Sequence, residues 1–252
     1  MQKYLDINEQ GLSVRCKLYY GTDARNISDI VIATYGFGGN KDNSATEKFA
    51  ERMLSKNKKG GVLVFDWPYH GADARNKLTI SECLTYFQMV IDYAKRELGA
   101  QRLYSYGTSF GGFINLIYLA ENENPFERIA LRCPAVKMYD IMAVRITDEE
   151  RTKLKKGKEI VRGYQRPIKL SQEFFDELGS YNVTSNEYFD VAEKMLIIAG
   201  NKDDFIALSD VEEFCDNNVI ECVVIDKADH PFSDPRIMDL AISKIVDFFQ
   251  NS

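Results

Sequence analysis

The chain has 252 residues, of which 45% are hydrophobic and 28% are charged. This composition is typical of globular proteins and excludes the disordered and fibrous classes. The 32 Lys and Arg residues against 38 Asp and Glu residues give a formal net charge of -6, so we expect no nucleic-acid partner and no attraction to anionic membranes. The length permits one or two domains, and α/β folds of this size commonly form one unit.

Residues 1–10 lack the basic start and the apolar centre of a signal peptide. No apolar run approaches the roughly 20 residues that a membrane helix needs. The five cysteines are an odd number and have no C-x-x-C spacing that would suggest zinc binding or redox chemistry. We therefore expect a cytoplasmic protein, a monomer or a homodimer, with buried free thiols.

Short apolar runs rich in β-branched and aromatic residues recur along the chain and predict buried strands. Residues 2–7 and 12–20 alternate in polarity and predict an antiparallel hairpin at a sheet edge. The six later runs are residues 30–35, 62–65, 103–106, 129–133, 195–199 and 220–225. The sequence thus predicts eight strands.

Helical stretches with recognisable starts separate these runs. Ser44, Thr79 and Ser209 are each followed three residues later by glutamate, which is capping-box spacing, and Asp234 precedes a proline suited to the first helical position. Alternating strands and helices predict an α/β fold with a mostly parallel sheet covered on both faces.

The stretch between the strands at 129–133 and 195–199 is too long for one crossover. Within it, residues 158–164 and 167–170 are predicted to pair as a small hairpin, and residues 171–178 to form a capped helix. We therefore expect a core made of residues 1–134 and 191–252, with residues 135–190 inserted as a lid.

The sharpest chemical signal is a G-x-S-x-G pattern centred on Ser109, directly after a predicted strand and directly before an apolar helical run. A tight turn at this place lifts a serine above the sheet, and small neighbours let other backbone approach it. The helix that follows adds its N-terminal dipole, which favours negative charge at this point. This context predicts a nucleophile rather than an ordinary turn.

A serine nucleophile needs a base, which is most often a histidine oriented by a carboxylate. The chain has two histidines, His70 and His230, and His230 is preferred because it follows the serine and a late strand. The orienting acid is expected after the strand at 195–199, where Asp203 and Asp204 are adjacent. We favour Asp203 because Gly200 and Asp203 have the spacing of a tight turn, with Asp204 as the alternative.

Developing negative charge on the substrate also needs backbone N–H donors. Phe110, directly after the serine, is one expected donor, and Phe37, in the glycine-rich loop after the strand at 30–35, is the other. The same loop does not complete the G-x-G-x-x-G fingerprint of a dinucleotide site. This chemistry needs no metal and no organic cofactor.

Together these motifs resemble the α/β-hydrolase family over essentially the whole chain. The loop from Tyr35 to Gly39 resembles the family's H-G-x-G-G oxyanion loop with tyrosine in place of histidine. Residues 66–71 resemble its D-x-x-G-H-G loop with Tyr69 in place of the first glycine. The elbow at Ser109, the acid turn at Asp203 and the Ala-Asp-His-x-Phe-Ser tail around His230 follow in the family's order.

The tail, the Gly-Phe-Gly-Gly-Asn loop and the position of the insert are similar to those of small bacterial carboxylesterases of the cinnamoyl and feruloyl esterase group. That resemblance implies a serine hydrolase that cleaves a small-molecule ester through an acyl-enzyme, with a lid over an aromatic acyl pocket. An acyl thioesterase or acyl-peptidase on the same scaffold remains the alternative, and a catalytically silent ligand-binding protein a remoter one.

The predicted lid carries a run of basic residues in an otherwise acidic chain. The run predicts either a solvated face or attraction of an anionic substrate, such as an acyl group with a carboxylate or an acyl-CoA thioester. Its members are Arg151, Lys153, Lys155, Lys156, Lys158, Arg162 and Arg166.

Overall fold

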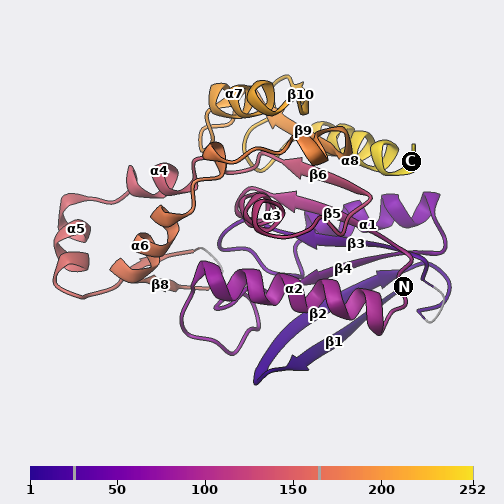
Figure 1. Ribbon diagram of the computed structural model, residues 1–252, viewed down its shortest axis with the longest axis horizontal. Coiled ribbons are helices and arrows are strands. Elements are labelled where there is room, and N and C mark those ends of the chain that lie inside the picture. Colours follow the sequence, from indigo (N-terminus) through magenta and orange to yellow (C-terminus); the bar gives the residue numbers. More distant parts are fainter. Residues whose placement is uncertain (25–26, 164–165, 252) are drawn as a thin grey trace.

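The computed structural model describes residues 1–24, 27–163 and 166–251. Its main sheet has eight strands in the order β1-β2-β4-β3-β5-β6-β9-β10 (Figure 1). Their bounds are β1 Gln2–Glu9, β2 Leu12–Tyr20, β3 Asp29–Thr34, β4 Gly60–Phe65, β5 Arg102–Thr108, β6 Arg128–Arg132, β9 Met195–Gly200 and β10 Glu221–Ile225. The predicted strand number is confirmed.

Strand β2 runs antiparallel to both of its neighbours, and the other pairs in the sheet are parallel. The predicted hairpin at the sheet edge is therefore confirmed. Strands β3, β4 and β9 are buried along their whole length, while β1 alternates between exposed positions and partly or fully buried ones. This is the burial expected of central parallel strands and of an edge strand.

Helices cover the two faces of the sheet in packed pairs. The long helices are α1 Ser44–Lys56, α2 Ile80–Arg96, α3 Phe110–Glu121, α7 Leu208–Asn218 and α8 Pro235–Gln250. Helix α1 packs against α8 on one face, and α2 packs against α3 on the other (Figure 1). Among the described residues, no helix has the length and apolarity that crossing a bilayer would require.

Two of the four expected helix caps are correct and two are wrong. Thr79 and Asp234 cap α2 and α8 as expected. Helix α1 is capped instead by Asn43, whose side chain accepts from the Thr46 amide at 2.8 Å, so Ser44 is already the first helical residue. Ser209 lies inside α7, which begins one residue earlier. Capping-box spacing alone therefore does not distinguish a helix cap from a serine one or two residues inside the helix.

The chain between β6 and β9 forms its own small group of elements, at the left of Figure 1. They are α4 Met138–Ala143, α5 Asp148–Lys155, β7 Ile160–Arg162, β8 Ile168–Leu170, α6 Gln172–Ser180 and the 3₁₀ turns Val183–Ser185 and Phe189–Lys194. Strands β7 and β8 pair antiparallel, and Ser171 caps α6. Residues 164 and 165 of the expected lid lie outside the described residues.

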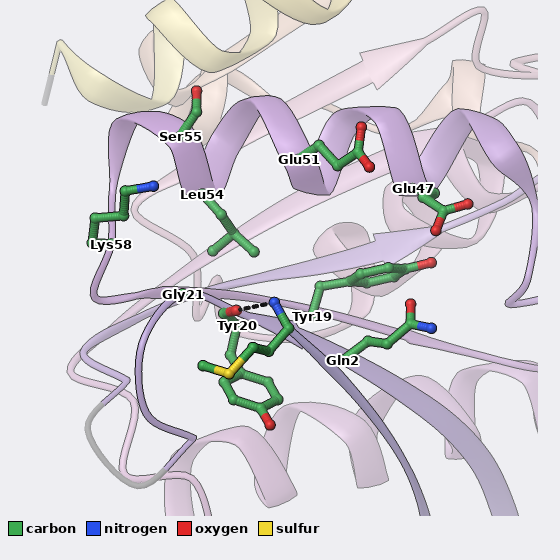
Figure 2. Close-up of a pocket in the computed structure, with 10 residues that line it drawn as sticks. Gln2, Tyr19, Tyr20, Gly21, Glu47, Glu51, Leu54, Ser55 and Lys58 are labelled. Atoms are coloured by element: carbon green, nitrogen blue, oxygen red, sulfur yellow. Dashed lines mark hydrogen bonds between the residues drawn. The ribbon is translucent and has the colours of Figure 1, made fainter.

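A pocket of about 440 Å³ lies between the start of the chain and α1 (Figure 2). Tyr19, Leu54 and two glutamates of α1 line it, and the amino terminus donates a hydrogen bond to the Tyr20 carbonyl at 3.0 Å. None of its lining residues borders Ser109. This pocket is therefore separate from the predicted site.

Two exposed valines at helix ends differ in the sign of φ and give a matched pair for testing backbone strain. Val219, at the end of α7, has φ +57° and is 75% exposed. Val144, at the end of α4, has φ -65° and is 76% exposed. Only the first requires the left-handed conformation, which a β-branched residue adopts at a cost.

We expect Val219→Gly to raise the free energy of unfolding by about 1 kcal/mol, because glycine removes the left-handed strain. Val144→Gly should lower it by about 0.5–1 kcal/mol, because glycine only loosens a regular helix end. Denaturant unfolding of both variants measures the difference. Equal effects of the two substitutions would contradict the strain at Val219.

Candidate active site

Ser109 joins β5 to α3 in a strained backbone conformation, with φ +52° and ψ -114°. A non-glycine residue rarely adopts such angles, and it persists in them only where surrounding contacts hold it. The Ser109 amide donates to the Arg132 carbonyl at 3.0 Å, and the Ser109 carbonyl accepts from the amides of Phe113 and Ala135 at 3.0 and 3.2 Å. These bonds hold the backbone from which the Ser109 hydroxyl projects.

Two glycines, Gly111 and Gly36, lie where β3 and the loop after it approach this turn closely. A Cβ on Gly111 would lie 2.7 Å from the backbone carbonyl of Thr34, and a Cβ on Gly36 would lie 3.3 Å from the Cβ of Ser109. Atoms at the first distance overlap, so the last glycine of the G-x-S-x-G pattern is a packing requirement. The loop after β3 thereby reaches the serine itself.

The structure brings Ser109, His230 and Asp203 into one chain of hydrogen bonds. His230 Nε2 lies 3.0 Å from Ser109 Oγ, and His230 Nδ1 lies 2.7 Å from Asp203 Oδ2. Ser109 follows β5, Asp203 follows β9 and His230 follows β10. The carboxyl ends of these parallel strands share one edge of the sheet. An imidazole held in this way can take a proton from a serine hydroxyl.

The Asp203 carboxylate is held charged by its partners. Its pKa is lowered although burial acts against this, because it bonds His230 and accepts from the amides of Phe205 and Ile206, both at 2.8 Å. The two amides use Oδ1 and leave Oδ2 for the imidazole. The carboxylate is therefore fixed in position as well as in charge.

The alternatives to these residues lie elsewhere. Asp204 is exposed, and its backbone carbonyl accepts from Arg145. His70 is fully buried, and its Nδ1 lies 2.9 Å from the Pro68 carbonyl rather than near the serine. The sequence-based preference for Asp203 and His230 thus agrees with the geometry of the hydrogen bonds.

The two expected N–H donors lie on either side of the serine. Phe110 is the first residue of α3, so no carbonyl of that helix accepts from its amide. Phe37 follows Gly36, where an added Cβ would lie 3.3 Å from the Cβ of Ser109, and the Phe37 ring packs against that of Phe110 with centroids 6.0 Å apart. Both amides stay the expected donors to an oxyanion that forms on a substrate carbonyl oxygen.

A buried carboxylate ties the loop after β3 to the loop after β4. Asp66 is fully buried and accepts from the Lys41 ammonium at 3.0 Å, the amides of Lys41 and Ala72 at 2.8 Å, and the Tyr35 hydroxyl at 3.2 Å. Burial, together with the Asp66 charge, raises the pKa of the Tyr35 hydroxyl well above its usual value, so it stays a donor. This network positions the backbone that carries Phe37.

The tyrosine that replaces the family's histidine is part of this network. Besides bonding Asp66, the Tyr35 hydroxyl accepts from the Trp67 amide at 3.0 Å, and the Trp67 indole donates to the Tyr35 carbonyl at 3.1 Å. Tyr69 replaces the first glycine of the D-x-x-G-H-G pattern, and its ring packs beneath the Arg166 guanidinium at 4.8 Å. Tyr35 and Tyr69 therefore hold loops in place and do not supply reacting groups.

A cavity of about 720 Å³ opens at Ser109 and His230. Apolar side chains from the chain between β6 and β9, including Met138, Ile141 and Met142 of α4, form part of its wall. Arg132, Arg145 and Arg162 also border it. The volume accommodates a small organic molecule, and its lining combines apolar and cationic groups.

Most of the basic run does not face this cavity. Arg162 forms an ion pair with Glu150, and their hydrogen bond lowers the pKa of Glu150 to about 2. Arg166 donates to backbone carbonyls of residues 70, 71, 73 and 75, and Lys153 pairs with Glu149. Of the seven residues in the run, only Arg162 borders the cavity.

One group of side chains in the described chain has the spacing of metal ligands, namely Cys133, Asp203 and His230, with donor atoms within 4.8 Å of one another. Burial, followed by the nearby Asp203 charge, raises the pKa of Cys133 to about 12 despite the opposing Arg132 charge. The sulfur therefore keeps its proton at neutral pH, and a protonated thiol is a poor metal ligand. All five cysteines are free.

Sequence reasoning missed the buried network around Asp66 and the role of Arg132 in the cavity wall. Arg132 ends a buried strand, and a charge at a strand end ordinarily points into solvent. The D-x-x-G-H-G motif was the available signal for Asp66, but it does not reveal Lys41 as the partner.

Comparison with known proteins agrees with this architecture. The family model described as the alpha/beta hydrolase fold matches residues 29–153. No curated protein matches the chain in sequence. The chain therefore has the α/β-hydrolase fold, as the resemblance of its motifs implies.

Solved structures match along almost the whole chain. Est1E from Butyrivibrio proteoclasticus, solved with ferulic acid bound, is 18% identical with a TM-score of 0.79, and 98% of each chain is covered. A putative hydrolase from Agrobacterium vitis is 17% identical with a TM-score of 0.78, and 99% of each chain is covered. The mouse alpha/beta hydrolase domain-containing protein 10 is 16% identical with a TM-score of 0.75, again over 99% of each chain. At these identities the likeness concerns the fold.

His70 should make the stability of the protein depend on pH. Burial lowers its pKa from 6.5 to about 4, so in this range the unfolded chain binds a proton that the folded chain does not. The stabilisation that comes from keeping His70 neutral in the folded protein is fully present above about pH 6.5. It is lost as the pH falls towards 4. Between pH 7 and 5 the loss is about 2 kcal/mol.

Denaturant unfolding of the wild type and of His70→Phe at pH 7 and pH 5 measures this effect. The phenylalanine keeps a ring against Phe110, on which His70 stacks, but it cannot titrate. The wild type should lose about 2 kcal/mol more than the variant between the two pH values. The same loss in both proteins would show that His70 is not held neutral.

Proposed function

We propose that the protein is a serine hydrolase that cleaves carboxylic esters through an acyl-enzyme. The observation that carries this proposal is the pair of hydrogen bonds that links Ser109 Oγ to His230 Nε2 and His230 Nδ1 to Asp203. The α/β-hydrolase fold supports it, because this fold commonly presents a serine nucleophile at the same strand-to-helix turn.

In the first step, Ser109 Oγ attacks the ester carbonyl carbon while His230 Nε2 takes the hydroxyl proton. The Asp203 carboxylate stabilises the imidazolium, and the Phe37 and Phe110 amides donate to the oxyanion. Collapse of the tetrahedral intermediate breaks the bond to the alcohol oxygen, which receives the proton from His230. The acyl group is then bonded to Ser109.

In the second step, water attacks the acyl carbonyl while His230 takes one of its protons. The bond between the acyl carbon and Ser109 Oγ breaks, and the serine oxygen recovers its proton from the imidazolium. The products are the free acid and the regenerated enzyme. No metal and no organic cofactor takes part in these two reaction steps.

The segment 135–190 acts in this proposal as a lid that supplies the wall of the acyl pocket. Met138, Ile141 and Met142 of α4 border the cavity beside Ser109 and support this role. Est1E, which has the same fold, was solved with ferulic acid bound. Hydroxycinnamoyl and short acyl esters are therefore the first substrates to test.

Replacing Ser109 by alanine should lower kcat by three orders of magnitude or more, because no second nucleophile is in place. Hydrolysis of 4-nitrophenyl acetate, butyrate and octanoate and of methyl ferulate measures this loss. Thioester and acyl-peptide substrates belong in the same panel, because the acyl-enzyme chemistry is common to all three classes.

Ser81→Ala is the matched control, since Ser81 is an exposed residue of α2 outside the cavity. It should retain wild-type turnover, and both variants should unfold at the same denaturant concentration as the wild type. Hydrolysis of any of these substrates that survives in Ser109→Ala would contradict the assignment of the nucleophile.

A further inference from the structure

Arg132 is a buried cation in the wall of the cavity. It ends β6, and only 4% of its surface is exposed. Its guanidinium donates from Nε to the Tyr106 hydroxyl at 3.3 Å and from Nη1 to the Pro231 carbonyl at 3.2 Å, and it stacks on the Phe232 ring at 4.8 Å. All of these partners are neutral.

No carboxylate within the described chain forms an ion pair with Arg132, and its Nη2 donates to no acceptor there. The nearby Asp203 carboxylate is already used by His230 and two backbone amides. Arg162, in the same cavity wall, has Glu150 as its partner. A buried charge without a counter-ion is costly, so the free end of Arg132 is suited to an anion that enters the cavity.

The guanidinium lies close to the reacting groups. The Arg132 carbonyl accepts from the Ser109 amide at 3.0 Å, and the Pro231 carbonyl that holds Nη1 belongs to the residue after His230. Ser109, His230 and Arg132 line the same cavity, so an acyl group bonded to Ser109 shares this space with the guanidinium.

A second guanidinium that borders the cavity has no carboxylate partner in the part of the chain that the structure describes. There, Arg145 donates only to the backbone carbonyls of Ile141 and Asp204, and it stacks on the Phe205 ring at 4.6 Å. It is exposed, in contrast to Arg132. The two arginines give this part of an acidic protein a local positive field.

We propose that the substrate is an ester whose acyl part carries a carboxylate a few bonds from the scissile carbonyl, and that Arg132 binds this carboxylate. The inference rests on the proposed ester hydrolysis and names its substrate class, the monoesters of short dicarboxylic acids. The free Nη2 end of this planar guanidinium can donate a charge-assisted hydrogen bond to a carboxylate, and burial strengthens the contact. Water-exposed lysines of the basic run offer neither feature.

Monomethyl succinate, glutarate and adipate, each beside its neutral amide analogue, test this substrate class. In each pair a terminal carboxylate is exchanged for a carboxamide of nearly the same shape. At the chain length that fits, kcat/KM for the acid should exceed that for the amide about 10- to 100-fold, the size expected of one charge-assisted contact. A ratio near one at all three lengths would overturn the proposal.

Arg132→Gln should remove this preference, and Arg132→Lys should restore part of it. The ratio of the two rates within one protein cancels any general loss caused by disturbing a buried residue. Arg151→Gln is the control, because Arg151 belongs to the basic run, borders no part of the cavity and bonds the Ala143 carbonyl. It should keep the wild-type ratio, and loss of preference there would assign the effect to the general field.

A binding measurement separates this inference from the proposed function. Succinate, glutarate or adipate should raise the Tm of the Ser109→Ala protein more than the corresponding diamide does, and should not raise that of the Ser109→Ala, Arg132→Gln protein. If neutral esters are hydrolysed but no dicarboxylate binds through Arg132, the substrate class is wrong and the hydrolase stands. If no ester is hydrolysed, the hydrolase falls and the binding result alone decides the anion site.

Discussion

Backbone from three strands meets at Ser109 more closely than most side chains permit. The end of β3 approaches so near that a Cβ on Gly111 would overlap the Thr34 carbonyl, while the end of β6 holds the serine amide. These contacts keep Ser109 at φ +52°, a conformation that it would leave if they were removed. The direction of the hydroxyl, and with it the distance to His230, depends on this packing.

Around that turn, the loops at one edge of the sheet are fixed by buried charge. Asp203 is held by two backbone amides and the imidazole, and Asp66 by an ammonium, a phenol and two backbone amides. A carboxylate satisfied on all sides costs little to bury and much to displace. Arg132 differs from both, because its partners leave one end of a buried cation unsatisfied. The two carboxylates are thus fully hydrogen-bonded, whereas one end of the buried guanidinium has no acceptor among the described residues.

The sequence was sufficient for the parts of this arrangement that local rules specify. Buried runs separated by helical stretches predict the eight strands, and the glycines around Ser109 predict the turn, because only glycine tolerates such close backbone approach. The Gly200 to Asp203 spacing predicts the carboxylate, because a tight turn holds it at the strand end. His230 follows from chain order.

The remaining features depend on contacts between distant parts of the chain. Lys41 and Asp66 are 25 residues apart, and Arg132 and Pro231 are 99 apart, so no spacing in the sequence connects them. The basic run illustrates the reverse case, because its charges cluster in sequence while Arg162 is neutralised by Glu150 in the fold. Local composition therefore predicted a charged face within residues 135–190, whereas in the described part of the chain tertiary packing places a buried cation without a carboxylate partner at the end of β6.

Covalent labelling with a fluorophosphonate tests the central claim most directly, because this reagent reacts only with a serine that has a working base. The account predicts one adduct per chain, found by peptide mass spectrometry on Ser109, with labelling much slower in His230→Ala. An adduct on another residue, or no adduct in the folded protein, would contradict it.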